Sequence, residues 1–289
     1  MSVKKAILPV AGFGTRLLPA SKSIPKEMVT VVDRPAIDYV VREAVEAGID
    51  TIILVNHPAK QAIENYFDRN AELESLLQAK KKDAILEEIR SIIPEHVTVV
   101  TVRQSAPLGL GHAVLCAEKV IGDEPFAVLL PDVLVDSADR NNLAQMIEQF
   151  DGSKASQIMV EEVEPARVDQ YGIVRLEEQD GQLTTNILEL VEKPAVDQAP
   201  SNLAVVGRYV FNPEIFKYLH QTQADKSGEI QLTDAMAKLL AEQQIHSFTL
   251  KGETYDCGSK IGYLKAIVHF ALQRDDLKTD FAKFLNELK

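Results

Sequence analysis

Cysteine, basic residues and long apolar runs are all scarce in this sequence of 289 residues. The two cysteines, Cys116 and Cys257, are far apart and form no CxxC pair, so neither a disulfide framework nor a structural zinc site is expected. The 31 Lys and Arg are outnumbered by 43 Asp and Glu, which gives a net charge of −12. This balance argues against a general nucleic-acid binder and against a polybasic membrane surface.

No stretch approaches the roughly 20 apolar residues that a bilayer-spanning helix needs. Segment 1–10 has two lysines and a short apolar run, but Pro9 and Arg16 follow too soon for a signal peptide. With two unpaired cysteines, these features predict a cytoplasmic protein in a reducing compartment. The length fits one large α/β domain or two small ones, and 46% hydrophobic residues can form a substantial core.

Short apolar runs alternate with amphipathic stretches through the first half of the chain. This alternation predicts an α/β fold with a mainly parallel sheet that helices cover on both faces. The lysine run at 80–82 is expected on the solvated face of a helix. The predicted strands are 5–10, 51–56, 97–102 and 126–130, and the predicted helices are 35–48, two within 59–90, 111–120 and 142–150.

The pattern changes after Gly152, where strands follow one another with fewer helices between them. They form either antiparallel additions to the same sheet or a subdomain beside it. The chain has no repeat and no Gly/Ser linker, so a single unit over 1–289 is the economical interpretation. The predicted strands are 157–163, 173–177, 188–192, 204–211 and 247–250, followed or interrupted by helices at 229–243 and from 260 onward.

The most informative segment is the loop at 8–27, which follows the first strand. Gly12 and Gly14 form a turn at the carboxyl end of that strand, which is where ligands bind in open α/β sheets. Glycines there let backbone N–H groups approach phosphate oxygens. The spacing is not the dinucleotide fingerprint, because Leu17 stands where a third glycine would be, and no Walker A sequence follows.

Three cations follow this glycine turn, Arg16, Lys22 and Lys26, against the single acid Glu27. In an acidic chain, such a local excess of positive charge favours a cradle for a triphosphate. The alternative is a Gly/Pro-rich surface loop whose charges are incidental.

Two aspartates follow strands and are candidate metal ligands. Asp132 comes directly after the apolar strand at 126–130, and Asp256 lies in a short loop after another strand. Mg²⁺ is usually held by one or two carboxylates together with substrate phosphates. For both aspartates a turn or capping role is the alternative, and the nearby Asp136 is expected to be only solvated.

These segments together resemble the sugar-1-phosphate nucleotidylyltransferases, over nearly the whole chain. The loop matches the family pattern G-x-G-T-R, L-x-P, P-K. Several motifs in the right order carry the resemblance more strongly than any one of them. The supporting segments are 103–104 (RQ), 109–113 (GLGHA), 126–134 (FAVLLPDVL), 190–194 (LVEKP), 206–209 (VGRY), 228–234 (GEIQLTD) and 255–258 (YDCG).

The resemblance implies a reaction and its partners. A uridylyl group would pass from UTP to glucose 1-phosphate with Mg²⁺, giving UDP-glucose and pyrophosphate. It also implies a Rossmann-like three-layer sandwich of the nucleotide-diphospho-sugar transferase type, with a mixed, mainly parallel central sheet. In this single domain, about 1–152 would form the nucleotide-binding half, about 153–259 the sugar-phosphate-binding half and about 260–289 the C-terminal helices. Family members are usually homodimers or homotetramers.

The resemblance assigns roles to individual residues of this sequence. Gly172 and Val205 would meet the sugar through their backbones, and Gln104, with a donor and an acceptor, suits the edge of a pyrimidine. The implied groups are catalytic Arg16, Lys26, Asp132 and Lys193; nucleotide-binding Ala11, Gly12, Gly14, Thr15, Gln104 and Gly109; sugar-phosphate-binding Gly172, Glu192, Lys193 and Val205; and metal-binding Asp132 and Asp256.

Without the resemblance, several of these residues have plainer interpretations. Gln104 is then a strand-end polar residue satisfied by water, the Glu192–Lys193 pair is surface decoration, and His112 is a residue at the start of a helix. Two other functions stay open. One is a nucleotidylyltransferase for another nucleoside triphosphate and sugar 1-phosphate, and the other is a non-catalytic sugar-nucleotide-binding regulatory homologue.

Overall fold

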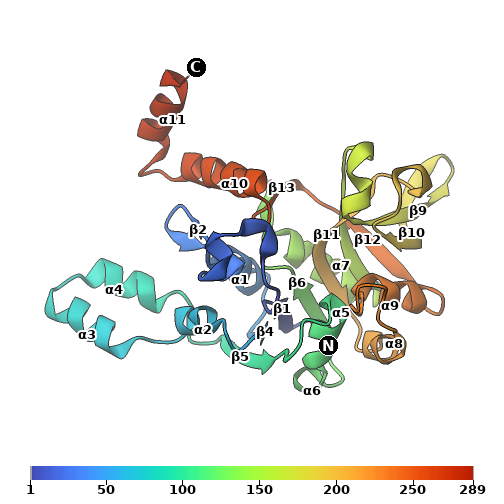
Figure 1. Cartoon of the computed structure of the whole chain (residues 1–289), viewed down its shortest axis with the longest axis horizontal. Coiled ribbons are helices and arrows are strands. Elements are labelled where there is room, and N and C mark those ends of the chain that lie inside the picture. The colour runs from blue at the N-terminus through green and yellow to red at the C-terminus, as the bar shows by residue number, and fades with distance from the viewer. Residues whose placement is uncertain (1, 289) are drawn as a thin grey trace.

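The computed structural model describes residues 2–288 and has one large sheet of nine strands at its centre (Figure 1). In chain order these strands are β1 (Lys5–Pro9), β4 (Thr51–Asn56), β5 (Thr98–Arg103), β6 (Phe126–Leu129), β8 (Ser156–Glu162), β9 (Gly172–Gln179), β10 (Gln182–Glu192), β11 (Leu203–Phe211) and β12 (Ile245–Thr249). They lie side by side in the order β5-β4-β1-β6-β11-β8-β12-β10-β9.

Helices cover both faces of this sheet, and two small two-stranded sheets flank it. The helices are α1 (Ala36–Glu46), α2 (Gln61–Phe67), α3 (Ala71–Ala79), α4 (Asp83–Arg90), α5 (Leu110–Cys116), α6 (Glu118–Ile121), α7 (Asn142–Ser153), α8 (Ile215–Gln221), α9 (Leu232–Leu240), α10 (Lys260–Gln273) and α11 (Lys278–Glu287). The small sheets pair β2 (Thr30–Val31) with β3 (Arg34–Pro35), and β7 (Val133–Ser137) with β13 (Gly252–Asp256).

The first half of the chain builds a parallel sheet around β1, which lies between β4 and β6. Ile7 is level with Ile53 of β4 and with Val128 of β6, and all three side chains are fully buried. Strands covered on both faces are apolar at consecutive positions, which is why these runs could be recognised in the sequence.

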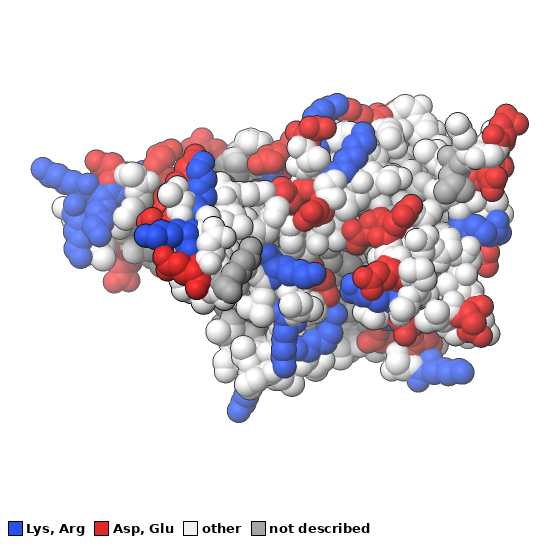
Figure 2. All heavy atoms as spheres, turned by 90° about the horizontal axis from the view of Figure 1, so that it is seen from above, with Lys and Arg blue, Asp and Glu red and all other residues white. Residues whose placement is uncertain are grey.

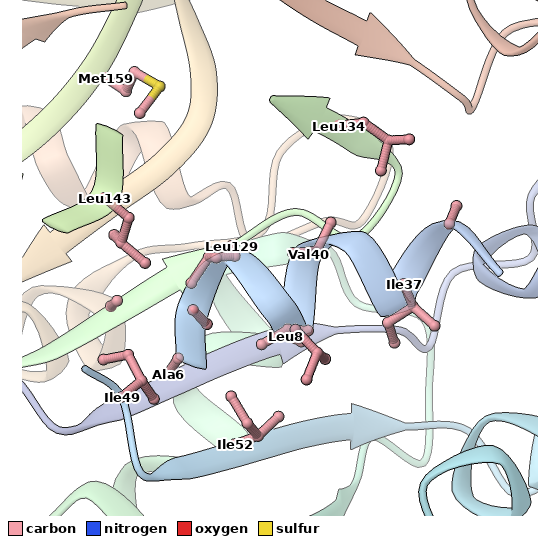
Figure 3. Close-up of a cluster of buried hydrophobic side chains, with 14 of the residues drawn as sticks. Ala6, Leu8, Ile37, Val40, Ile49, Ile52, Leu129, Leu134, Leu143 and Met159 are labelled. Atoms are coloured by element: carbon pink, nitrogen blue, oxygen red, sulfur yellow. The ribbon is translucent and has the colours of Figure 1, made fainter. Parts of the chain in front are cut away.

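Alternate residues of β1 supply the two faces of the core, because side chains alternate along a strand. Ile7 joins the cluster under α5, α8 and α9. Ala6 and Leu8 point to the opposite face, where they pack with Ile37 and Val40 of α1 (Figure 3). The sheet is therefore a middle layer between two apolar interfaces.

The second half of the chain extends the same sheet. Strand β11 runs antiparallel to both β6 and β8, and β12 runs parallel to β8. Of the two arrangements left open by the sequence, antiparallel additions to the same sheet are confirmed. The α/β class with a mixed central sheet is confirmed as well.

The expectation of two helices within 59–90 is wrong, because the structure has three. The backbone is extended at Asp68, after which the side chain of Asn70 caps α3 by accepting the Leu73 amide at 3.0 Å. The lysine run at 80–82 is exposed, as expected, but forms the turn between α3 and α4. Figure 2 shows basic side chains gathered at this far end of the molecule, away from the large sheet.

Two further helix boundaries differ from the expectation. The helix expected at 111–120 is divided at Ala117, whose amide bonds the carbonyl of Val114 in the tighter 3₁₀ manner. The helix expected at 229–243 begins only at Leu232. Before it, Ile230 donates its amide to Leu108 O and accepts from the Gly111 amide, both at 2.8 Å, so this stretch bridges to the loop before α5.

The C-terminal helices leave the sheet. Helix α10 packs on β13 and β2, whereas α11 contacts α10, has no buried residue among those described and projects outward (Figure 1). Within residues 2–288, none of the helices combines the length and apolar character needed to cross a membrane.

Candidate functional site

The glycine turn after β1 closes onto Lys26. Gly14 has φ 65°, a conformation that glycine adopts readily, and a Cβ there would lie 2.9 Å from Cβ of Lys26. The base of the loop is fixed by the buried Lys60, whose Nζ donates to Val10 O at 2.7 Å and to Glu27 at 2.8 Å. The loop is therefore anchored at both ends, and Lys26 is held against the sheet.

Asp132 is the partner of Lys26. It follows β6 and its side chain is 10% exposed, and its Oδ2 accepts a hydrogen bond from Lys26 Nζ at 2.5 Å. The ladder between β7 and β13 sets Asp256 opposite Val133, so the second carboxylate reaches the same place. Arg16 lies against both carboxylates, at 3.2 Å from Asp256 and 3.9 Å from Asp132.

Gly258 leaves room between these side chains. A Cβ at this position would lie 2.6 Å from Arg16 Nη2, 2.7 Å from Asp132 Oδ2 and 2.9 Å from Asp256 Oδ1. Two carboxylate oxygens from separate segments thus converge on one small space. Such an all-oxygen donor pair fits a hard divalent cation that takes its remaining ligands from water and substrate. Among residues 2–288 no group of three or more His, Cys, Asp or Glu forms a closed metal site.

A fully buried arginine holds the segment that carries Asp132. Arg208 on β11 donates through Nη1 to Leu130 O at 3.2 Å and through Nη2 to Val133 O at 2.7 Å, on either side of Asp132. Its guanidinium also pairs with Glu43 of α1 at 2.7 Å. The hydrogen bonds of Arg208 to Leu130 and Val133 therefore hold the backbone on both sides of Asp132 in place.

The charges of the site shift each other's pKa. Burial acts to raise the pKa of Asp132, but the Lys26 ammonium outweighs it and the pKa lies below its ordinary value. Burial acts to lower the pKa of Lys26, yet Asp132 and Glu27 outweigh it and raise that pKa. Asp132 and Lys26 are therefore both charged at neutral pH.

A cavity of about 300 Å³ opens beside this cluster, between the glycine turn and the start of α5. Four predicted nucleotide-binding residues line it, and Lys26 and Asp132 form its inner end. The two other predicted members, Gly14 and Thr15, belong to the same loop but do not line this cavity. The four lining residues are Ala11, Gly12, Gln104 and Gly109.

A second cavity, of about 200 Å³, lies on the other side of Asp132. Arg16, Asp256 and Val205 line it, and Asp132 and Leu130 line both cavities. Asp132 is therefore at the junction of two adjacent spaces, one large and one small.

The predicted sugar-binding residues gather next to this second cavity. A Cβ on Gly172 would lie 3.3 Å from Glu192 Oε2 and 3.5 Å from Cγ2 of Val205. Glu192 Oε2 also accepts a hydrogen bond from Thr233 of α9 at 2.6 Å. Lys193 has a positive φ of 44°, and its Nζ, on a side chain 57% exposed, lies 3.3 Å from Glu192.

The sequence interpretation missed several residues of the site. Glu161 and Tyr171 line the second cavity, and Glu229 lines the first. Thr233 and Arg208 support the site from α9 and β11. Three of them lie within quoted motifs that could have signalled them, Glu229 and Thr233 in GEIQLTD and Arg208 in VGRY.

Comparison with known proteins shows the family to which this chain belongs. A family model described as nucleotidyl transferase matches residues 5–272. The chain belongs to the nucleotidyl transferase family.

Individual proteins that are similar to this chain have more specific names than the family model. A curated protein of Haemophilus influenzae named UTP–glucose-1-phosphate uridylyltransferase is 50% identical, with 98% of each chain covered. A solved structure described as UTP-bound UGPase from Acinetobacter baumannii is 56% identical with a TM-score of 0.92, covering 99% of this chain and 100% of that one. Another, described as UDP-glucose pyrophosphorylase complexed with UDP-glucose, is 41% identical with a TM-score of 0.84, covering 94% and 100%.

Proposed function

We propose that this chain transfers the uridylyl group of UTP to glucose 1-phosphate, forming UDP-glucose and pyrophosphate. The observation that carries the proposal is the cluster of Lys26, Asp132, Arg16 and Asp256 at the junction of two cavities. Two phosphate-bearing substrates must meet in such a reaction, and this is the place where two adjacent spaces share the Asp132 carboxylate and have cations on either side of it. The names of the relatives at about 50% identity agree with it.

The larger cavity would hold UTP. Gln104 and the backbones of Ala11, Gly12 and Gly109 would contact the base, because they line this cavity. Gly14 and Thr15 would direct their amides toward the triphosphate as it passes along the loop. The phosphates would then extend toward Lys26 and Arg16.

The smaller cavity would hold glucose 1-phosphate. Glu192 would accept hydrogen bonds from sugar hydroxyls, beside the backbones of Gly172 and Val205. Lys193 would bind the sugar phosphate, since its exposed ammonium is free to swing from Glu192 toward an anion. This arrangement brings the phosphate of the sugar toward Asp132.

The chemical step requires alignment more than acid–base catalysis. An oxygen of glucose 1-phosphate attacks the α-phosphorus of UTP, the bond from that phosphorus to the bridging oxygen breaks, and pyrophosphate leaves with the electron pair. A phosphate monoester has a second pKa of about 6, so it is already a nucleophile at neutral pH. Lys26 would offset charge at the α-phosphate and Arg16 would hold the departing pyrophosphate.

Asp132 and Asp256 would hold Mg²⁺, as their convergence beside Gly258 indicates. When bound, Mg²⁺ supplies positive charge that counters the repulsion between the two anions. Lys26 and Arg16 pair with these two carboxylates, and the same cations would be within reach of the substrate phosphates.

Three broader assignments accompany this function. Residues 1–152 would form the nucleotide half, 153–259 the sugar-phosphate half and 260–289 the C-terminal helices of one domain. We also propose a homodimer or homotetramer, supported by apolar side chains exposed on α10 and α11, among them Ile261, Leu264 and Phe284. A cytoplasmic location stays a prediction from the sequence.

The direct test is pyrophosphate release from purified protein given Mg²⁺, glucose 1-phosphate and each of the five common nucleoside triphosphates in turn. We expect UTP to give the highest kcat/KM. A different preferred nucleotide would replace the proposed substrate pair with another of the same class. Nucleotide binding without any pyrophosphate release would instead support a regulatory homologue.

A further inference from the structure

Gln104 is held by two hydrogen bonds from one end of its side chain. It follows β5, is buried, and lines the larger cavity. Its Nε2 lies 3.1 Å from Gly109 O and 3.0 Å from Nδ1 of His112, on the first turn of α5. Both contacts come from the loop and helix that form one wall of the cavity.

These partners decide the orientation of the amide. A backbone carbonyl only accepts hydrogen bonds, so the atom that contacts Gly109 O must be the NH₂ group of Gln104. The second N–H of that group points to His112 Nδ1, which must accept and therefore carries no proton. Neutral His112 has its hydrogen on Nε2 in this arrangement.

The opposite end of the amide is then the one presented to a ligand. Gln104 Oε1 has no hydrogen-bond partner within residues 2–288, yet it is not one of the fully enclosed, unpartnered side-chain atoms. On a side chain that lines the larger cavity, this leaves one acceptor facing the space. The NH₂ group cannot turn toward the cavity without losing both of its bonds.

Cys116 completes the cluster one helical turn further along α5. Its Sγ lies 3.8 Å from the same Nδ1 of His112. A thiol is a weak donor, so it is compatible with an accepting Nδ1 and would be less suited to a protonated one. The Gln104 amide thus requires this nitrogen to accept, and the thiol is only compatible with that state.

We infer that His112 is a positioning residue that locks Gln104 with its carbonyl toward the base, and that this lock selects pyrimidines carrying an N3–H. Uracil and thymine both donate from N3, whereas cytosine has an unprotonated N3 that accepts. A fixed acceptor therefore binds UTP and disfavours CTP. The inference rests on the proposed function, in which the larger cavity holds the nucleotide base.

The lock can be tested with three variants at helix α5. His112→Phe keeps a flat ring but removes the acceptor, and His112→Asn restores an acceptor through its side-chain oxygen. Cys116→Ala is the matched control, since it changes the same cluster and leaves the Gln104 bonds intact. The readouts are KM and kcat for UTP and CTP, and KM for glucose 1-phosphate.

In His112→Phe we expect the ratio of kcat/KM for UTP over CTP to fall about tenfold, the size of one lost neutral hydrogen bond. The change should appear in KM for the nucleotide, with kcat and the KM for glucose 1-phosphate within about twofold of wild type. His112→Asn should recover most of the ratio, and Cys116→Ala should keep it. A ratio unchanged in His112→Phe would overturn the inference.

A second measurement keeps the inference testable if turnover is absent or His112→Phe folds poorly. Equilibrium binding of UTP and of N3-methyl-UTP, which lacks the N3–H, requires no catalysis. Wild type should bind UTP about tenfold tighter than the methylated analogue, and His112→Asn should preserve that difference better than His112→Leu. Equal loss of both nucleotides in both variants would mean a structural role only and would reject the lock.

The two proposals fail in different ways. If wild type releases no pyrophosphate from UTP and glucose 1-phosphate, the proposed function is rejected, while the binding comparison still decides the role of His112. If wild type is active but His112 has no effect on the base preference in either experiment, only the inference about His112 is rejected.

Discussion

At the scale of single residues, the site depends on the pairing of Lys26 with Asp132. The two are bonded at 2.5 Å beneath a glycine turn, and each holds the other's pKa in the range that keeps both charged. The sequence could indicate both residues, because Asp132 follows an apolar strand and Lys26 is one of three cations after the glycine turn. It could not show that they touch, since that contact depends on how the loop at 8–27 folds back.

Replacing Asp132 tests the metal-binding assignment. We expect Asp132→Ala to lose at least about 100-fold in kcat/KM, the low end for a preorganised charge contact. Asp139→Asn, an exposed position outside the site, serves as the control and should stay within about twofold. Near-native turnover of Asp132→Ala with saturating Mg²⁺ would remove Asp132 from the mechanism.

Lys193 tests the sugar-phosphate assignment separately. Lys193→Ala should lose at least about 100-fold in kcat/KM and raise the KM for glucose 1-phosphate, because the nucleophilic phosphate would lack its cation. UTP affinity, measured by equilibrium binding, should be unchanged. An exposed lysine elsewhere, as in Lys226→Ala, provides the matched control. A weakened affinity for UTP alone would contradict the assignment.

The pH dependence of stability tests the Lys26–Asp132 pair. In wild type the pKa of Asp132 lies below 3.8, so the stability that Asp132 contributes is present above that pH and is lost as pH falls through the folded pKa. Lys26→Met removes the main group that lowers this pKa, and burial then raises it. In Lys26→Met, the buried Asp132 would therefore favour the folded state only while it is protonated, at low pH. The free energy of unfolding would fall as the pH rises and the carboxyl ionises.

The measurement is urea unfolding of wild type and Lys26→Met from pH 4 to pH 8. We expect the difference in unfolding free energy to grow with pH and to reach about 3 kcal/mol, typical of an unpaired buried charge. If this difference stays constant over the range, the loss of Lys26 does not raise the pKa of Asp132 and the prediction is wrong.

At the scale of elements, the sequence predicted the strands better than the helices. The buried strands stood out because they are apolar at consecutive positions and covered on both faces. The pairing of β7 with β13 was missed, because its burial pattern is mixed and Asp256 comes from a distant segment. That pairing is what brings the second carboxylate into the site, so the site could not be assembled from the sequence alone.

The link between α1 and β11 gives a prediction at this scale. Glu43→Gln should destabilise the protein by about 3 kcal/mol, because it leaves the fully buried Arg208 without a charge partner. The double variant Glu43→Gln/Arg208→Met should lose less than the sum of Glu43→Gln and Arg208→Met alone, as expected for coupled residues. Urea unfolding of all four proteins gives the coupling energy, and simple additivity would contradict it.

At the scale of the whole molecule, the C-terminal helices have an apolar surface that the described chain does not cover. Helix α11 contacts α10 and projects from the body, and Leu264, Leu272 and Phe284 are exposed. If this surface joins copies of the chain, Leu264→Asp should reduce the mass measured by light scattering to that of a monomer. Lys265→Asp on the same helix is the control for charge, and an unchanged mass in both would place self-association elsewhere.

The hydrogen bonds between Ile230 and the loop before α5 connect the two proposed halves of the chain. Ile230 exchanges hydrogen bonds with Leu108 and Gly111, and Glu229 beside it lines the larger cavity. Part of the wall of the larger cavity, where we propose that the nucleotide binds, is therefore supplied by the segment leading into α9, within the half proposed to bind the sugar phosphate. A polypeptide cut near residue 152 would leave its first fragment without part of the wall of the larger cavity and with an unpaired edge on β6, so the two proposed halves could not fold as separate units.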